Sequence, residues 1–138
     1  MNEYADFHDG SFEGLWIDGK TAHIFLANYL NERFVVVASE VAALSVEGVR
    51  SGNIILDVLI RDPQDADTAD IRALYSIATG PDEELQVNRC LERVRLQQLK
   101  LLEINPSYGA SGLVLAASFE LLRREDWTER YQRVNELS

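Results

Sequence analysis

Two histidines are the residues best suited to acid–base or metal chemistry in this chain, and one of them, His8, is followed directly by Asp9. An imidazole beside a carboxylate can act as a general base or as a metal ligand. A hairpin described below places His23 opposite Gly14, roughly 20 Å along the strand from His8 at ~3.3 Å per residue. We therefore expect no shared ion, and predict that His8 or Asp9 hydrogen-bonds to backbone at the entry to the first strand.

A second group of possible ligands is a run of carboxylates after residue 61, formed by Asp62, Asp65, Asp67 and Asp70. Oxygen ligands of this kind suit calcium. Asp65 and Asp67 fit the first two places of a calcium loop, but Ala69 and Asp70 occupy its third acidic position and its glycine position. The pattern favours a solvated connector whose last acids or Thr68 cap a following helix. We predict no metal and no cofactor.

The segment 105–112 contains Ser107, Tyr108 and Ser111 between a proline and two glycines. Loops held by rigid strands carry many binding residues, so we take His8, Asp9, Ser107 and Tyr108 as the candidate ligand-binding residues. For the segment itself the residue types favour a plain hairpin connection in which Tyr108 packs on the core. Ser111 lacks the G-x-S-x-G elbow and no phosphate loop occurs, so no catalytic residue is predicted.

These residues must be positioned by strands, and the first two are predicted at 12–17 and 21–28. Asp18-Gly19 between them is typical of a type I′ hairpin turn. With these two residues as the loop, Trp16 faces Thr21, Gly14 faces His23 and Phe12 faces Phe25.

Further strands are predicted at 33–38, 42–49 and 53–61, the last two as a hairpin around Ser51-Gly52. Both faces of this second hairpin carry apolar residues, which indicates that both are covered. A short helix is predicted within 68–78, where alternating apolar residues also allow a strand.

The Gly80-Pro81-Asp82 segment predicts the start of a longer helix with an apolar stripe through Val87, Cys90, Leu91 and Val94. Strands follow at 96–104 and 113–122. A closing helix begins near Asp126 and packs through Trp127. The sequence thus predicts a single α+β domain over residues 1–138. Its antiparallel sheet has about seven strands, curled or in two layers, with one or two helices inserted before the last two strands and a C-terminal helix.

The formal net charge is −10, and the excess lies in two segments. Residues 1–20 hold five carboxylates and one lysine, and residues 62–84 hold seven carboxylates and one arginine. Such a balance disfavours nucleic acid and anionic membranes as partners. The start has no secretory pattern and the single cysteine has no disulfide partner, so we expect a cytoplasmic protein.

Composition and motifs together favour a noncatalytic binding module, of the inhibitor or immunity type, whose acidic surface meets a basic protein. Trp16, Asp18, Asp65 and Asp67 are the candidate interface residues. The alternative is a small-ligand-binding protein or enzyme with a pocket near the 105–112 loop and the His8-Asp9 segment. Pairing with a second copy of the chain is compatible with either function.

Overall fold

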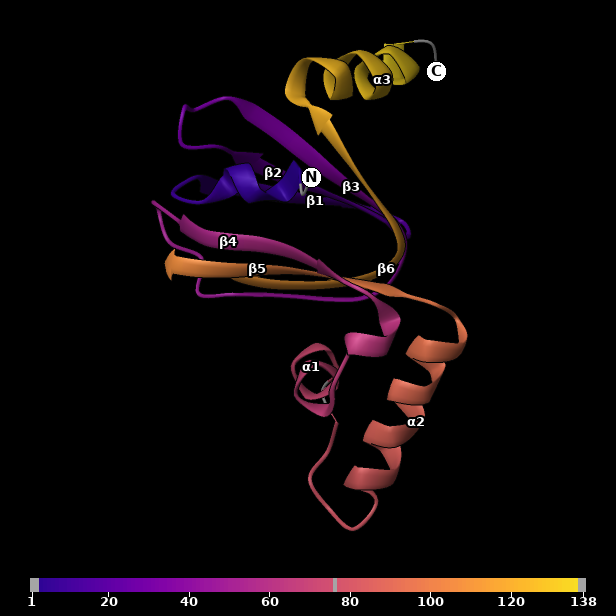
Figure 1. Ribbon diagram of the computed structural model, residues 1–138. Helices are drawn as coiled ribbons and strands as arrows, with labels where there is room; N and C mark the ends of the chain where they lie inside the picture. Colours follow the sequence, from indigo (N-terminus) through magenta and orange to yellow (C-terminus); the bar gives the residue numbers. More distant parts are fainter. Residues whose placement is uncertain (1–2, 76, 137–138) are drawn as a thin grey trace.

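The computed structural model describes residues 3–75 and 77–136 (Figure 1). In chain order the elements are η1 (Glu3–Phe7), β1 (Ser11–Asp18), β2 (Thr21–Ala27), β3 (Arg33–Glu47), β4 (Ile54–Arg61), η2 (Pro63–Asp65), α1 (Thr68–Leu74), α2 (Glu83–Leu96), β5 (Lys100–Tyr108), β6 (Ser111–Arg123) and α3 (Arg124–Glu136). The fold is therefore α+β, with antiparallel strands and a C-terminal helix, as predicted.

The six strands form a closed barrel in the order β1-β2-β3-β6-β5-β4, and every neighbouring pair is antiparallel. Figure 1 shows two layers, with β1 and β2 in the upper one and β4 and β5 in the lower one. The long strands β3 and β6 pair from Phe34↔Arg123 to Glu47↔Ser111 and so run through both layers. β3 bends where Glu40 takes a positive φ of 53°.

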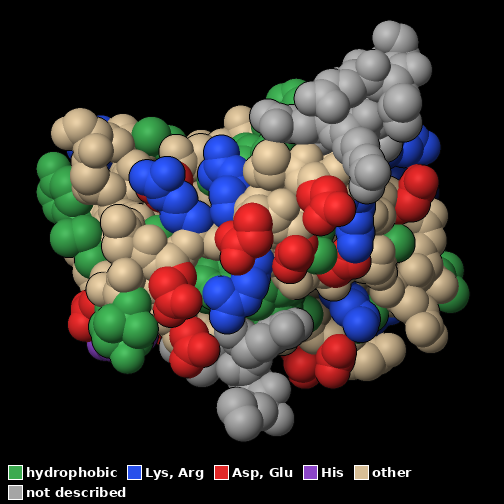
Figure 2. All heavy atoms as spheres, turned by 90° about the horizontal axis from the view of Figure 1, so that it is seen from above, with side chains coloured by type: hydrophobic (Ala, Val, Ile, Leu, Met, Phe, Trp, Pro, Cys, Tyr) green, Lys and Arg blue, Asp and Glu red, His purple; other side chains and the backbone are tan. Residues whose placement is uncertain are grey.

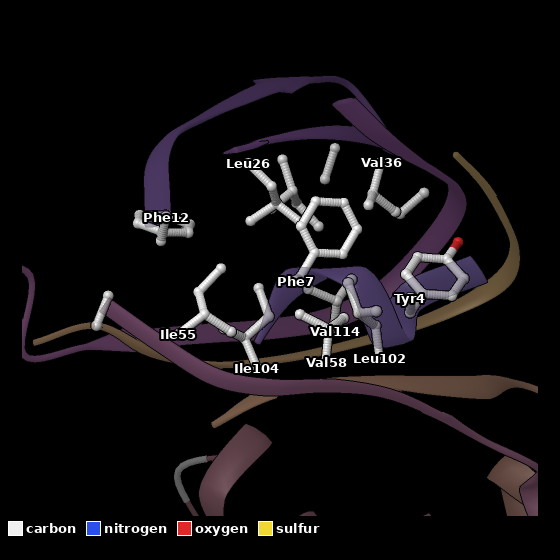
Figure 3. Close-up of a cluster of buried hydrophobic side chains, with 14 of the residues drawn as sticks. Tyr4, Phe7, Phe12, Leu26, Val36, Ile55, Val58, Leu102, Ile104 and Val114 are labelled. Atoms are coloured by element: carbon white, nitrogen blue, oxygen red, sulfur yellow. The ribbon is translucent and has the colours of Figure 1, made fainter. Parts of the chain in front are cut away.

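The barrel interior is filled by aliphatic side chains around the 3-10 helix η1, whose Tyr4 and Phe7 point inward (Figure 3). Phe7 meets the ring of Phe34 edge-on, with 5.4 Å between centroids. Burying a phenylalanine of this kind contributes about 1.5–3 kcal/mol relative to leaving it in water. The N-terminal segment is thus part of the core and lies alongside β4.

Helices α1 and α2 cover the outer face of the lower layer (Figure 1). Ile71 of α1 and the predicted stripe of α2 pack on Leu101 of β5 and Leu115 of β6. On the upper layer, α3 packs through Trp127 onto Val35 and Val37 of β3. The two helical layers enclose the barrel from opposite sides. In the described part of the chain, no helix is long and apolar enough to cross a membrane.

The predicted register of the first hairpin was wrong by two residues between Gly14 and Asp18, and by one residue at Phe12, which lies opposite Leu26 rather than Phe25. Asp18 pairs with Thr21, so the loop is Gly19-Lys20, and Trp16 lies opposite His23. The positive φ of 59° at Gly19, the first central position, fits a type II′ turn. Between Gly14 and Asp18 a shift of two residues keeps each side chain on the same face, so the hydrophobic pattern there could not expose the error. The bulge between Phe12 and Gly14 shifts the register by one residue and places Phe12 in the barrel interior with Leu26.

The predicted second hairpin does not form. Residues 33–47 make one continuous strand that pairs with β2 and β6, while β4 pairs with β5 and β1. The Ser51-Gly52 segment lies in a connection across the end of the barrel rather than in a tight turn. The described chain therefore has six strands in place of about seven.

The helical predictions were closer. The ambiguous segment is the helix α1, capped by Asp67 as the connector pattern suggested, and α2 begins at Glu83. The strand predicted from residue 96 begins at Lys100, because α2 extends to Leu96 and Gln98 takes a positive φ of 53°. The closing helix begins at Arg124, two residues before the predicted Asp126, and Trp127 packs as expected.

Candidate functional site

The His8-Asp9-Gly10 segment forms the seam where the barrel closes. The Nδ1 atom of His8 lies 2.7 Å from the carbonyl oxygen of Leu56, and the Asp9 amide donates to the Ile55 carbonyl at 3.0 Å. Gly10 is required here, since a Cβ would lie 2.1 Å from the Ala27 carbonyl oxygen. The predicted backbone role of His8 and Asp9 at the entry to β1 is confirmed.

The connection between β5 and β6 is fastened to this seam by Asn53. The Oδ1 atom of this residue accepts hydrogen bonds from the amides of Arg50 and Ala110 at 2.7 and 3.0 Å. Tyr108, at the end of β5, pairs with Ile54 and is 56 % exposed. Ser107 beside it is also exposed. The expectation that Tyr108 packs on the core was wrong, because the hairpin turns its ring outward.

On the lower layer, α1 and α2 pack on residues of β3, β5 and β6, and much of the outer face of β4 stays exposed. Ile55 and Val58 point into the barrel (Figure 3), whereas Ile54, Leu56 and Leu59 are 45 %, 44 % and 38 % exposed. An irregularity in the pairing with β5 lies between Ile55 and Asp57. We call the exposed surface the β4 face; its members are Ile54, Leu56, Asp57 and Leu59 of β4 with Glu103, Asn105 and Tyr108 of β5.

Carboxylates lie within and around the β4 face. Asp57 accepts a hydrogen bond of 2.7 Å from Asn105, and Glu103 lies 3.0 Å from the Nε atom of Arg61. Asp9 adjoins this face at the seam, on the opposite side of β4 from β5. The exposed residues Asp62, Asp65 and Asp67 follow the end of β4. Both acidic segments of the sequence therefore contribute charge beside this strand.

Arg61 is the cation that offsets part of this charge. Its guanidinium lies 2.6 Å from Asp70 and also contacts Glu103. The hydrogen bond to Asp70 raises the pKa of Arg61 above its ordinary value, with burial opposing it. Asp67 and Asp70 form a reciprocal capping box at the start of α1, and the Asp70 amide lowers the pKa of Asp67. These acids are engaged in holding the helix.

The second histidine sits in a separate aromatic cluster under α3. His23 is 1 % exposed, stacks on Trp16 with 4.5 Å between centroids, and accepts at Nδ1 a 2.9 Å hydrogen bond from Trp127 Nε1. Tyr131 meets its ring edge-on. Because indole can only donate, neutral His23 carries its proton on Nε2. Burial lowers the pKa of His23, and nearby Asp18 partly opposes this.

The two histidines thus contact different elements and do not meet. Among the described residues, no group of three or more His, Cys, Asp or Glu side chains is placed to hold a metal ion. Three hollows lined by described residues lie away from His8 and Tyr108. One of them is lined by Glu13, Phe25, Arg33 and Arg124.

The surface seen from the α3 side carries both signs of charge (Figure 2). Arg130 pairs with Glu120 at 2.5 Å, and Arg33 lies 3.6 Å from Glu13. Trp16 and Asp18, predicted at an interface, are exposed near this side at the end of β1. The α3 side therefore lacks the excess of one sign that marks the surroundings of β4.

Sequence reasoning missed the apolar members of the β4 face. Ile54, Leu56 and Leu59 alternate with buried residues. Because the strand is apolar on both faces, both faces were expected to be covered. The helices α1 and α2 pack on parts of β3, β5 and β6, through Ala43, Leu101 and Leu115, and leave these β4 residues exposed. The sequence did contain evidence for an exposed face: residues 53–61 are apolar on both sides, and the few predicted helices are too short to cover every strand.

In the described residues, the fold is a small closed antiparallel barrel with helical covers on two sides and an exposed apolar surface on β4. No family model matches the chain, and comparisons with curated proteins and with solved structures find no match.

Proposed function

We propose that this protein is a noncatalytic binding module whose β4 face docks a basic protein partner, as an inhibitor or immunity-type protein does. The supporting observation is the exposed row of Ile54, Leu56, Leu59 and Tyr108 on a sheet face that the described helices leave uncovered. Large apolar side chains gathered on a rigid sheet are typical of interaction surfaces. Tyrosine is enriched at such positions.

The charges beside this row determine the kind of partner. Asp57 and Glu103 lie within the face, Asp9 lies at the seam beside it, and three further aspartates follow β4. Complementary potential speeds association and rejects partners of like charge. A surface with an apolar centre and a basic rim fits this arrangement. A second copy would bring the same carboxylates together in an isologous contact, which disfavours self-pairing here.

Site-specific photo-crosslinking tests this proposal. A photoreactive phenylalanine analogue replaces Leu56 on the β4 face or, as a matched control, Leu96, which is 77 % exposed on α2. In source-cell lysate at low salt we expect one dominant crosslinked protein with a basic surface from position 56 and none from position 96. Salt should reduce its yield, because exposed charges are screened.

A charge variant sharpens the same experiment. Asp9→Asn removes one carboxylate while keeping a residue that tolerates the positive φ of 63° at this position. We expect a lower crosslinking yield from position 56 and unchanged folding. Equal products from positions 56 and 96, or no product at low salt, would overturn the proposal.

A further inference from the structure

The barrel is closed at β1 by a short seam, in which backbone hydrogen bonds join residues 9–12 to residues 53–55. β1 pairs with β2 along its length, from Ser11↔Ala27 to Asp18↔Thr21. On its other side it pairs with β4 only at Ser11↔Ile54, and the Phe12 amide donates to the Asn53 carbonyl at 3.1 Å. Beyond this point, no described strand pairs with that side of β1. We call this open side, residues 13–18, the β1 edge.

An open strand edge presents unpaired amide and carbonyl groups that can pair with another strand. Proteins block such edges with proline, lysine, bulges or a covering segment. β1 has a bulge between Phe12 and Gly14, but its remaining residues pair regularly with β2 and include no proline, lysine or arginine. η1, which could have covered the edge, lies along β4.

The side chains on this edge are suited to contact. Trp16 and Ile17 are 39 % and 53 % exposed, whereas Leu15 packs toward the barrel interior. Trp16 is held in place by stacking on His23 and by an edge-on contact with Trp127. A pre-positioned aromatic ring beside unpaired backbone groups offers both parts of strand addition, which are main-chain hydrogen bonds and side-chain contacts.

We infer that the β1 edge accepts an extended, basic segment of a partner protein as an added strand. Glu13 and Asp18 lie at the two ends of the edge. Arg33 lies 3.6 Å from Glu13, but it belongs to β3, which is on the other side of β2 from the edge. Lysine or arginine opposite these acids would be favourable. An antiparallel pair of two β1 edges that matches residues 13–18 throughout would instead set Glu13 against Asp18. Like charges directly opposite are destabilising, so a second copy is the poorer occupant.

A synthetic peptide of about eight residues, the usual length of a strand, tests the inference. It alternates valine and threonine and carries one lysine near each end. Amide hydrogen exchange of the whole protein is measured with and without it. We expect slowed exchange within residues 13–18. An N-methylated peptide, which cannot complete the backbone pairing, and a peptide with glutamate for lysine should each bind at least about tenfold more weakly.

Matched protein variants separate this edge from the β4 face. Ile17→Lys places a cation and a flexible chain at the edge and should weaken binding of the lysine peptide by about tenfold. Leu59→Lys, at an exposed residue of the β4 face away from the seam, should leave this binding unchanged. A loss caused by Leu59→Lys would overturn the assignment to β1, whatever the outcome for the proposed function.

Two further results would also overturn the inference. One is equal binding of the N-methylated peptide, because contact would then not use the strand edge. The other is protection of residues 13–18 from exchange that increases with protein concentration in the absence of peptide, because a second copy would then occupy the edge.

Discussion

On the lower layer, α1 and α2 bury aliphatic side chains such as Leu91 against Leu101 and Leu115, whereas α3 covers the upper layer with Trp127 and Tyr131 around a buried histidine. The lower cover depends on apolar area, which does not change with pH. The upper cover includes a hydrogen bond that requires neutral His23. The two covers should therefore respond differently to cavities, to lost hydrogen bonds and to acid.

The largest expected effect is a cavity in the lower cover. Leu101→Ala removes a side chain that is 1 % exposed between α2 and the barrel. We expect a loss of about 2–5 kcal/mol in the free energy of unfolding, measured by urea denaturation. Leu96→Ala, at an exposed leucine of α2, should change it by less than about 0.5 kcal/mol. Equal losses would mean that the cover does not pack as described.

A smaller effect is expected when the upper cover loses its polar contact. Trp127→Phe keeps an aromatic ring but leaves the buried Nδ1 atom of His23 without its donor. An unsatisfied buried acceptor costs about 1–3 kcal/mol of stability. Trp16→Phe is the matched control, because Trp16 makes ring contacts with His23 and Trp127, whereas the hydrogen bond to His23 comes from Trp127. If both substitutions cost the same, the hydrogen bond is not what holds α3.

The pH dependence of stability distinguishes the two covers more directly. Burial lowers the pKa of His23, so the unfolded chain binds the proton more readily than the folded one. Stability is then complete above the ordinary histidine pKa of about 6.5 and falls as the pH drops below it toward the lower folded value. Urea denaturation between pH 8 and 5 should show this fall in the wild type and in Leu101→Ala.

The substitution His23→Gln is the control for that measurement. It removes the titrating group and should flatten the stability profile between pH 8 and 5, whatever its effect on absolute stability. Tryptophan fluorescence reports the same event, since Trp16 and Trp127 both contact His23. An unchanged slope in His23→Gln would assign the pH dependence to other groups.

The sequence predicted the positions of helices and strands better than it predicted which of them lie side by side. The helices α1 and α2 followed from Asp67 as a cap and from an apolar stripe, which are local patterns. The bond between Trp127 and His23 joins residues 104 positions apart, and no local pattern contains that distance. The pairing of β3 with β6 was missed for the same reason, since Ser51-Gly52 resembled a tight turn.

The candidate surface was predicted only in part. Its acidic composition could be read from the sequence, and His8 or Asp9 was correctly given a hydrogen bond to backbone. Tyr108 was considered for a ligand site or for the core, and not for this surface. The exposure of Leu56 could not be read from the sequence, because it depends on how far α1 and α2 cover the sheet. Whether an apolar strand is covered is a property of the packed layers rather than of the strand.

The smallest expected effect lies on the uncovered strand itself. Leu56→Thr replaces an exposed leucine by a residue with good strand propensity. Because little apolar area is removed from water at this position, the free energy of unfolding should change by no more than about 0.5 kcal/mol. The same substitution should reduce recovery of a partner crosslinked from Leu59. A loss above 1 kcal/mol in the isolated protein, about that of a removed hydrogen bond, would mean that Leu56 is retained for folding and that the β4 face is not a surface reserved for a partner.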